Sequence, residues 1–117
     1  ANSLAIDPEV QAQQAAAYPE LATLYSNAPY GETFERAEAI ARALGWELLR
    51  SDRNAGFIEA VDTTAIMAFK DDIVIRVRSA EDGSRVDLRS ASRVGVSDLG
   101  ANAARLRAFA ERFRAGA

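Results

Sequence analysis

The sequence predicts a two-layer α+β domain in the order helix, four-stranded antiparallel meander, helix. Apolar residues recur with helical spacing over residues 31–45 and again over residues 99–116, whereas residues 46–93 between them alternate with a period of two. The turns expected between consecutive strands are too short for parallel crossovers, so these strands must pair antiparallel. The apolar positions within residues 21–25 also allow an extra short strand before the first helix.

The first helix is expected directly after Pro29. The stripe with the i, i+3, i+4, i+7 spacing of one buried helix face consists of Phe34, Ala37, Ile40, Ala41 and Leu44. Gly45 follows the last residue of this stripe, and glycine at that position typically ends a helix because it adopts a positive φ without strain. The pattern therefore predicts a helix that stops just before Gly45.

Four strands are expected in the meander, over residues 46–52, 57–69, 73–79 and 85–93. The second strand carries a bulge or break at residues 62–64, and residues 70–72 form the turn into the third. The Asp-Gly pair at residues 82–83 is a strong hairpin signal. The second helix is expected from an N-cap at residues 97–98 to Gly116.

Length and composition indicate one globular domain. With 117 residues, 49% hydrophobic and 26% charged, the chain lies in the ordinary range for such domains, and we expect a tether over residues 1–17 and a single domain over residues 18–117. The absence of His and Cys excludes Ser-His-Asp and Cys-His catalysis, thiolate zinc sites and disulfides. We therefore expect no metal and no cofactor. Nucleic acid is not an expected partner, because the net charge is −3.

One face of the expected sheet is rich in arginine. Strand alternation places Arg76 and Arg78 of one strand beside Arg85 and Arg89 of the next, around Asp87. The simpler interpretation is a solvated face with cross-strand ion pairs, each of which contributes about 0.2–1 kcal/mol. The functional interpretation is a docking surface for a carboxylate- or phosphate-bearing partner.

Two shorter segments are weaker candidates. The connection from Ser92 to Asp98 contains Arg93 and Ser97 beside a helix start, which can hold an anion, although capping by Ser97 or Asp98 explains it equally well. In residues 70–72, the two adjacent carboxylates point to opposite faces of a strand and cannot easily form an acid/base pair. A turn with an ion pair from Asp72 to Lys70 or Arg76 is the expected structure.

Two runs of the sequence resemble a known family. Residues 69–78 read FKDDIVIRVR, residues 83–109 read GSRVDLRSASRVGVSDLGANAARLRAF, and GWELLRSDRNAGFIEAVDTT precedes them. Together they are similar to the bacterial family of domains of unknown function numbered 1499. The polar residues that match its motif are Lys70, Asp71, Asp72, Arg76, Arg78, Asp87, Arg89, Ser90, Ser92, Arg93, Gly95, Ser97, Asp98, Gly100, Asn102 and Arg105.

The resemblance implies an extracytoplasmic protein on the periplasmic side, attached to a membrane by a preceding segment, and it implies no established activity. We therefore expect a binding or interaction module without a membrane span in this chain, and with an anionic lipid, a cell-wall carboxylate or an acidic protein segment as candidate partner. The alternatives are a small carboxylate-dependent hydrolase, which the sequence supports poorly, and a structural subunit that pairs through its sheet. The candidate ligand-binding residues are Lys70, Asp72, Arg76, Arg89, Ser92, Arg93, Ser97, Asp98 and Asn102.

The same motif also predicts a fixed intramolecular network. Ser90 and Ser92 fall on the core side of their strand, near the start of the second helix. Because a buried hydroxyl needs a partner, we expect these serines to bond to Asp98 and Asn102.

Overall fold

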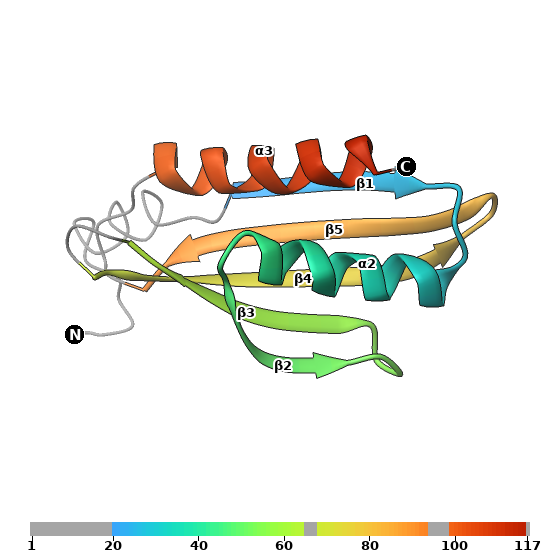
Figure 1. The fold of residues 1–117 in the computed structure, drawn as a ribbon, viewed down its shortest axis with the longest axis horizontal. Coiled ribbons are helices and arrows are strands. Elements are labelled where there is room, and N and C mark those ends of the chain that lie inside the picture. The colour runs from blue at the N-terminus through green and yellow to red at the C-terminus, as the bar shows by residue number, and fades with distance from the viewer. Residues whose placement is uncertain (1–19, 65–67, 94–98, 117) are drawn as a thin grey trace, which may run out of the picture.

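The computed structural model describes residues 20–64, 68–93 and 99–116. These residues form two helices and a five-stranded sheet, labelled as in Figure 1. In chain order the elements are β1 (Glu20–Ser26), α2 (Tyr30–Ala43), β2 (Glu47–Asp52), β3 (Phe57–Thr63), β4 (Lys70–Ala80), β5 (Gly83–Ser92) and α3 (Leu99–Ala115).

The sheet is antiparallel throughout, with the strand order β1-β5-β4-β3-β2. Strands β2 to β5 are the expected meander, and the α+β class is confirmed. The sheet has five strands and not four, because β1 pairs along β5. This pairing sets Leu24 opposite Val86, where Leu24 becomes part of the core with only 3% of its surface exposed.

The expected turn at residues 70–72 is wrong, because these residues begin β4 and pair with both neighbouring strands. The chain turns earlier, where the Thr64 N–H donates to the Phe69 carbonyl at 2.8 Å and the Ala68 N–H donates to the Thr64 carbonyl at 3.0 Å. Accordingly β3 ends at Thr63, close to the expected break, and does not continue to Phe69. Extended backbone at residues 70–72 sends Asp71 toward the core side and its neighbours to the other side.

Both helices cover the same face of the sheet (Figure 1). The core between the layers takes alternate residues from β3, β4 and β5 and one stripe from each helix. At one end of this core Trp46 stacks on Phe109 with ring centroids 5.9 Å apart, and Phe109 stacks on Phe113 at 6.2 Å. The opposite face of the sheet has no covering layer in the described part of the chain, as is common for antiparallel sheets.

Two glycines adopt nearly the same positive φ in different surroundings. Gly45, which follows α2 as expected, has φ +86° and nothing within 4 Å of the position a Cβ would occupy. Gly56, in the turn between β2 and β3, has φ +83°, but its Cβ would lie 2.5 Å from the carbonyl oxygen of Val77. A side chain would therefore strain the backbone equally at both glycines, but only at Gly56 would its Cβ also clash with a neighbouring strand.

We expect Gly45→Ala to lower the free energy of unfolding by about 1–2 kcal/mol, from the strain of a positive φ alone. Gly56→Ala should cost about 1–3 kcal/mol more, because the β4 backbone must move to admit the methyl group. Urea denaturation of both variants measures the difference. Equal losses would show that the contact of Gly56 with β4 is loose.

Candidate functional site

Arg105 of α3 connects the second helix to the sheet through two aspartates. Its Nη2 donates to Asp71 Oδ2 at 2.8 Å, and its Nε donates to Asp62 Oδ2 at 2.9 Å. Asp62 on β3 and Asp71 on β4 are directly opposite each other in the sheet, on the side that faces the helices. The side chains of Arg105 and Asp71 are 6% and 3% exposed, whereas that of Asp62 is 30% exposed. A buried guanidinium thus holds one buried and one partly exposed carboxylate.

Hydroxyl and amide groups complete this network. Arg105 Nη1 donates to Asn102 Oδ1 at 2.7 Å and to Ser90 Oγ at 3.1 Å. The Ser90 hydroxyl donates to Asn102 Oδ1 at 2.6 Å, and Asn102 Nδ2 donates to Ser92 Oγ at 3.3 Å. The expected contact of the two serines with the start of the second helix is therefore present, through Asn102. Asp98, its other expected partner, lies outside the described residues.

Arg105 and Asp62, the centre of this network, are not among the ligand-binding candidates that the sequence predicts. A signal for Asp62 and Asp71 was present, because each continues the core-facing alternation of its strand, two residues beyond Ala60 and two before Ile73. Arg105 is three residues from Asn102 and therefore on the same helix face. Because buried charges are paired, an arginine and two aspartates at core-facing positions are expected to form ion pairs with each other.

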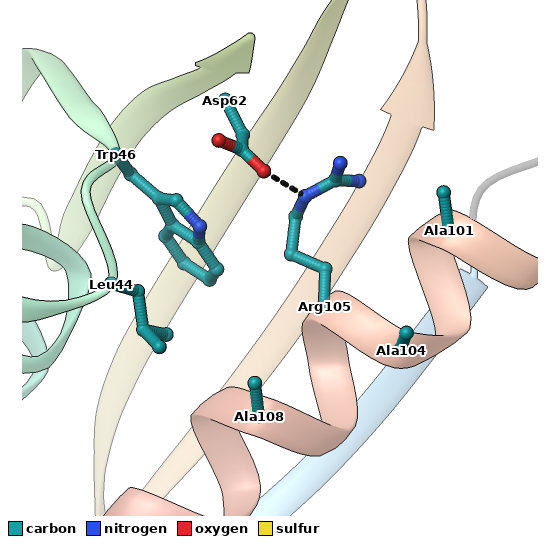
Figure 2. Close-up of a pocket in the computed structure, with 7 residues that line it drawn as sticks. All are labelled: Leu44, Trp46, Asp62, Ala101, Ala104, Arg105 and Ala108. Carbon is teal, nitrogen blue, oxygen red and sulfur yellow. Dashed lines mark hydrogen bonds and ion pairs between the residues drawn. The ribbon is translucent and has the colours of Figure 1, made fainter. Parts of the chain in front are cut away.

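A pocket lies beside this network, between α3, β3 and the turn that follows α2 (Figure 2). Its volume is about 380 Å³. Asp62 and Arg105 provide its charged groups, Trp46 and Leu44 line one side, and α3 contributes alanines on the other. The lining residues are Leu44, Trp46, Asp62, Ala101, Ala104, Arg105 and Ala108.

On the uncovered face of the sheet, Asp87 is held by its neighbours. The Thr23 hydroxyl donates to Asp87 Oδ1 at 2.6 Å, and Arg85 Nε donates to the same oxygen at 3.2 Å while lying 3.1 Å from Oδ2. Arg76, directly opposite Asp87, instead stacks its guanidinium over the Phe57 ring, with 4.7 Å between the guanidinium carbon and the ring centroid. Its Nε is buried and has no hydrogen-bond partner among the described residues.

The expected ion pair of Asp72 with Lys70 or Arg76 is wrong. Asp72 pairs with Arg93, whose Nε lies 3.0 Å from each carboxylate oxygen and whose Nη2 lies 2.9 Å from Oδ1. The register explains this choice, because Asp72 is opposite Ala91 and Arg93 is the diagonal neighbour two residues on. The hydrogen bond that Arg93 donates to Asp72 raises the pKa of Arg93 above its ordinary value, so this arginine stays charged.

The structure separates the candidate residues into groups that share no site. Ser92 and Asn102 belong to the network under α3, whereas four candidates belong to the uncovered face, and Lys70 is exposed at the start of β4. Residues 97 and 98 lie outside the described residues. The four on the uncovered face are Asp72, Arg76, Arg89 and Arg93.

Three arginines of the uncovered face, Arg76, Arg78 and Arg89, have no ion-pair partner within residues 20–64, 68–93 and 99–116. No group of three or more acidic side chains in those ranges could hold a metal ion. In the same ranges no helix has the length and the apolar character needed to cross a membrane.

These features define a two-layer α+β domain with both helices on one face of an antiparallel sheet, a buried arginine network beneath the second helix, and an arginine-bearing face opposite. A family model described as "Protein of unknown function (DUF1499)" matches residues 1–113, and the chain belongs to this family. The family resemblance of the two sequence runs is thereby confirmed. A search of curated proteins found no match.

The network makes a testable contribution to stability. We expect Arg105→Met to lower the free energy of unfolding by about 3–5 kcal/mol, because it leaves the buried carboxylate of Asp71 without its partner. Arg107→Met, at an exposed position of the same helix, is the matched control and should change stability by less than about 0.5 kcal/mol. Urea denaturation measures both, and similar values for the two variants would contradict a structural role of the network.

Proposed function

We propose that this chain is a binding module that holds an anionic group, a carboxylate or a phosphate, against the uncovered face of its sheet. The observation that carries the proposal is Arg76, which is held over Phe57 and whose buried Nε has no hydrogen-bond partner in the described part of the chain. A buried donor without an acceptor costs about 1–3 kcal/mol. An anionic ligand would supply that acceptor.

The position of Arg76 favours ligand binding over internal pairing. Asp87 is opposite Arg76, and its Oδ1 accepts hydrogen bonds from Thr23 and Arg85, whereas its buried Oδ2 has no hydrogen-bond partner among the described residues and makes no bond to Arg76. Stacking on Phe57 fixes the plane of the Arg76 guanidinium, so little side-chain entropy is lost when it bonds to a ligand. A guanidinium on a strand also needs no loop rearrangement to present its planar donors to two oxygens of one ligand.

The charge balance of this face supports the same conclusion. Two of its arginines are neutralised locally, Arg85 by Asp87 and Arg93 by Asp72. Arg76, Arg78 and Arg89, on the adjacent strands β4 and β5, then remain without an ion-pair partner among the described residues. Binding that depends on these charges should be screened by salt, because the Debye length falls from about 10 Å at 0.1 M to about 3 Å at 1 M.

An extracytoplasmic, periplasmic-side location with attachment to a membrane is part of this proposal. Its support is the family resemblance and the tether-like, Ala- and Gln-rich composition of residues 1–17. These residues lie outside the described part of the chain. Cell fractionation of the product of the full-length gene tests this part separately from ligand binding.

The two alternatives have less support. A carboxylate-dependent hydrolase needs at least two acidic groups around one pocket. The pocket beneath α3 is lined by Asp62 alone among the acidic residues described, and that carboxylate is bonded to Arg105. A structural subunit would pair through β1 or β2, the two edge strands, and sedimentation over a range of concentrations tests for such pairing.

We expect Arg76→Ala to weaken binding to phosphatidylglycerol vesicles about tenfold in 0.1 M salt, a loss of about 1.4 kcal/mol. The control is Arg53→Ala, which removes the same charge from the turn after β2, where Arg53 pairs with Glu35. Titration with inorganic phosphate and with acetate identifies the group recognised, and vesicles of phosphatidylcholine serve as the neutral surface. Binding that ignores both salt and Arg76→Ala would show that the arginines are structural.

A further inference from the structure

We propose that the pocket between α3, β3 and the turn after α2 binds a small organic cation, an alkylammonium. Its charged head group contacts Asp62, and its hydrocarbon part lies between Trp46 and the alanines of α3. This site is on the helix-covered side of the sheet, so the proposal is independent of the anion binding assigned to the uncovered face.

The shape of the pocket suits a small ligand with an apolar body. Its volume of about 380 Å³ is within the range typical of small-molecule sites, about 300–1,000 Å³. Figure 2 shows Ala101, Ala104 and Ala108 along the α3 wall, across from the Trp46 ring. The short side chains of α3 leave the space that a hydrocarbon chain would fill.

The charges beside the pocket favour a cation. One guanidinium, that of Arg105, faces two carboxylates, so the group carries one net negative charge. Asp71 is buried beneath Arg105, whereas the side chain of Asp62 is 30% exposed and lines the pocket. Asp62 uses Oδ2 for Arg105, and its Oδ1 has no hydrogen-bond partner among the described residues. The negative charge is therefore accessible from the pocket at Asp62.

An anion would have little access to Arg105, because its side chain is 6% exposed and four of its five N–H groups donate within the protein. All three guanidinium nitrogens already donate: Nε to Asp62, Nη2 to Asp71, and Nη1 to Ser90 and Asn102. Among the described residues, no other basic side chain lines the pocket. The Arg105 guanidinium therefore bonds mainly to the protein, whereas the more exposed carboxylate of Asp62 can be reached from the pocket.

Trp46 supplies the second element of a cation site. The face of an indole ring attracts cations more strongly than the other aromatic side chains do. Stacking on Phe109 at 5.9 Å holds this ring in place, and Trp46 itself is 5% exposed, so the aromatic wall is fixed before a ligand arrives. Trp46 and Asp62 together place an aromatic ring and a carboxylate in the lining of one pocket, a combination that suits an alkylammonium group.

The chain contains a single tryptophan, so its fluorescence reports directly on this pocket. We expect n-butylammonium chloride, titrated at constant ionic strength, to produce a saturable change in Trp46 emission. n-Butanol and sodium butyrate, which have the same hydrocarbon chain, should bind at least about tenfold more weakly, a difference of about 1.4 kcal/mol. The shift of the indole N–H signal in a ¹⁵N–¹H NMR spectrum provides an independent measurement.

Two variants test separately the charge of Asp62 and the free volume of the pocket. Asp62→Asn, which keeps the shape and an oxygen for Arg105, should weaken butylammonium binding at least about tenfold. Ala104→Leu fills the pocket from an exposed helix position without a change of charge and should also abolish the saturable response. Glu59→Gln, the same charge change on the opposite face of β3, is the control and should bind as the unaltered protein does.

Three results would overturn the proposal. They are the absence of a saturable response to butylammonium in the unaltered protein, equal affinity for butanol and butylammonium, and unchanged binding in Ala104→Leu. Circular dichroism confirms that each variant is folded. If Asp62→Asn does not fold, the comparison of butylammonium with butanol and the Ala104→Leu variant still decide the question.

Discussion

The arrangement of the two layers depends on one interaction, the contact of Arg105 with Asp71 and Asp62. Removing three charged groups from water is costly, and the cost is offset only where hydrogen bonds satisfy each of them. Arg105 makes four such bonds, to partners on β3, β4, β5 and its own helix. A slip of one residue in the pairing of β3 with β4 would carry Asp62 to the other face of the sheet. The network therefore favours one sheet register and one position of α3.

Alternation along β4 and β5 gives neighbouring residues separate roles. Asp71 faces the helices and bonds to Arg105, whereas Asp72 faces outward and bonds to Arg93. In the same way Ser92 belongs to the inner network and Arg93 to the outer face. A contiguous polar motif in the sequence is thus divided by the sheet into a structural interior and a charged exterior. This division explains why the motif does not form a single site.

Periodicity predicted much of the fold, and contacts between elements set the rest. The helical stripe beginning at Phe34 and the alternation along β4 specified where α2 and the meander lie. The partner of Asp72 could not be predicted, because it depends on the β4–β5 register, which places Arg93 diagonally across from it. The central role of Arg105 in the buried network could not be predicted for a related reason. Its side chain meets Asp62 and Asp71 only because α3 packs on the sheet.

The position of β1 at the sheet edge has a consequence for the order in which the chain acquires its structure. The partner of β1 is β5, so the hydrogen bond from Thr23 to Asp87 spans 64 residues. Each hairpin of the meander closes over a few residues, whereas closing the loop from β1 to β5 costs more chain entropy. During synthesis β1 leaves the ribosome first and finds its partner only after the meander is complete. Until then the outer edge of β5 is open to pairing with another chain, so the edge that β1 covers is the point at which a newly made molecule is most exposed to misassembly.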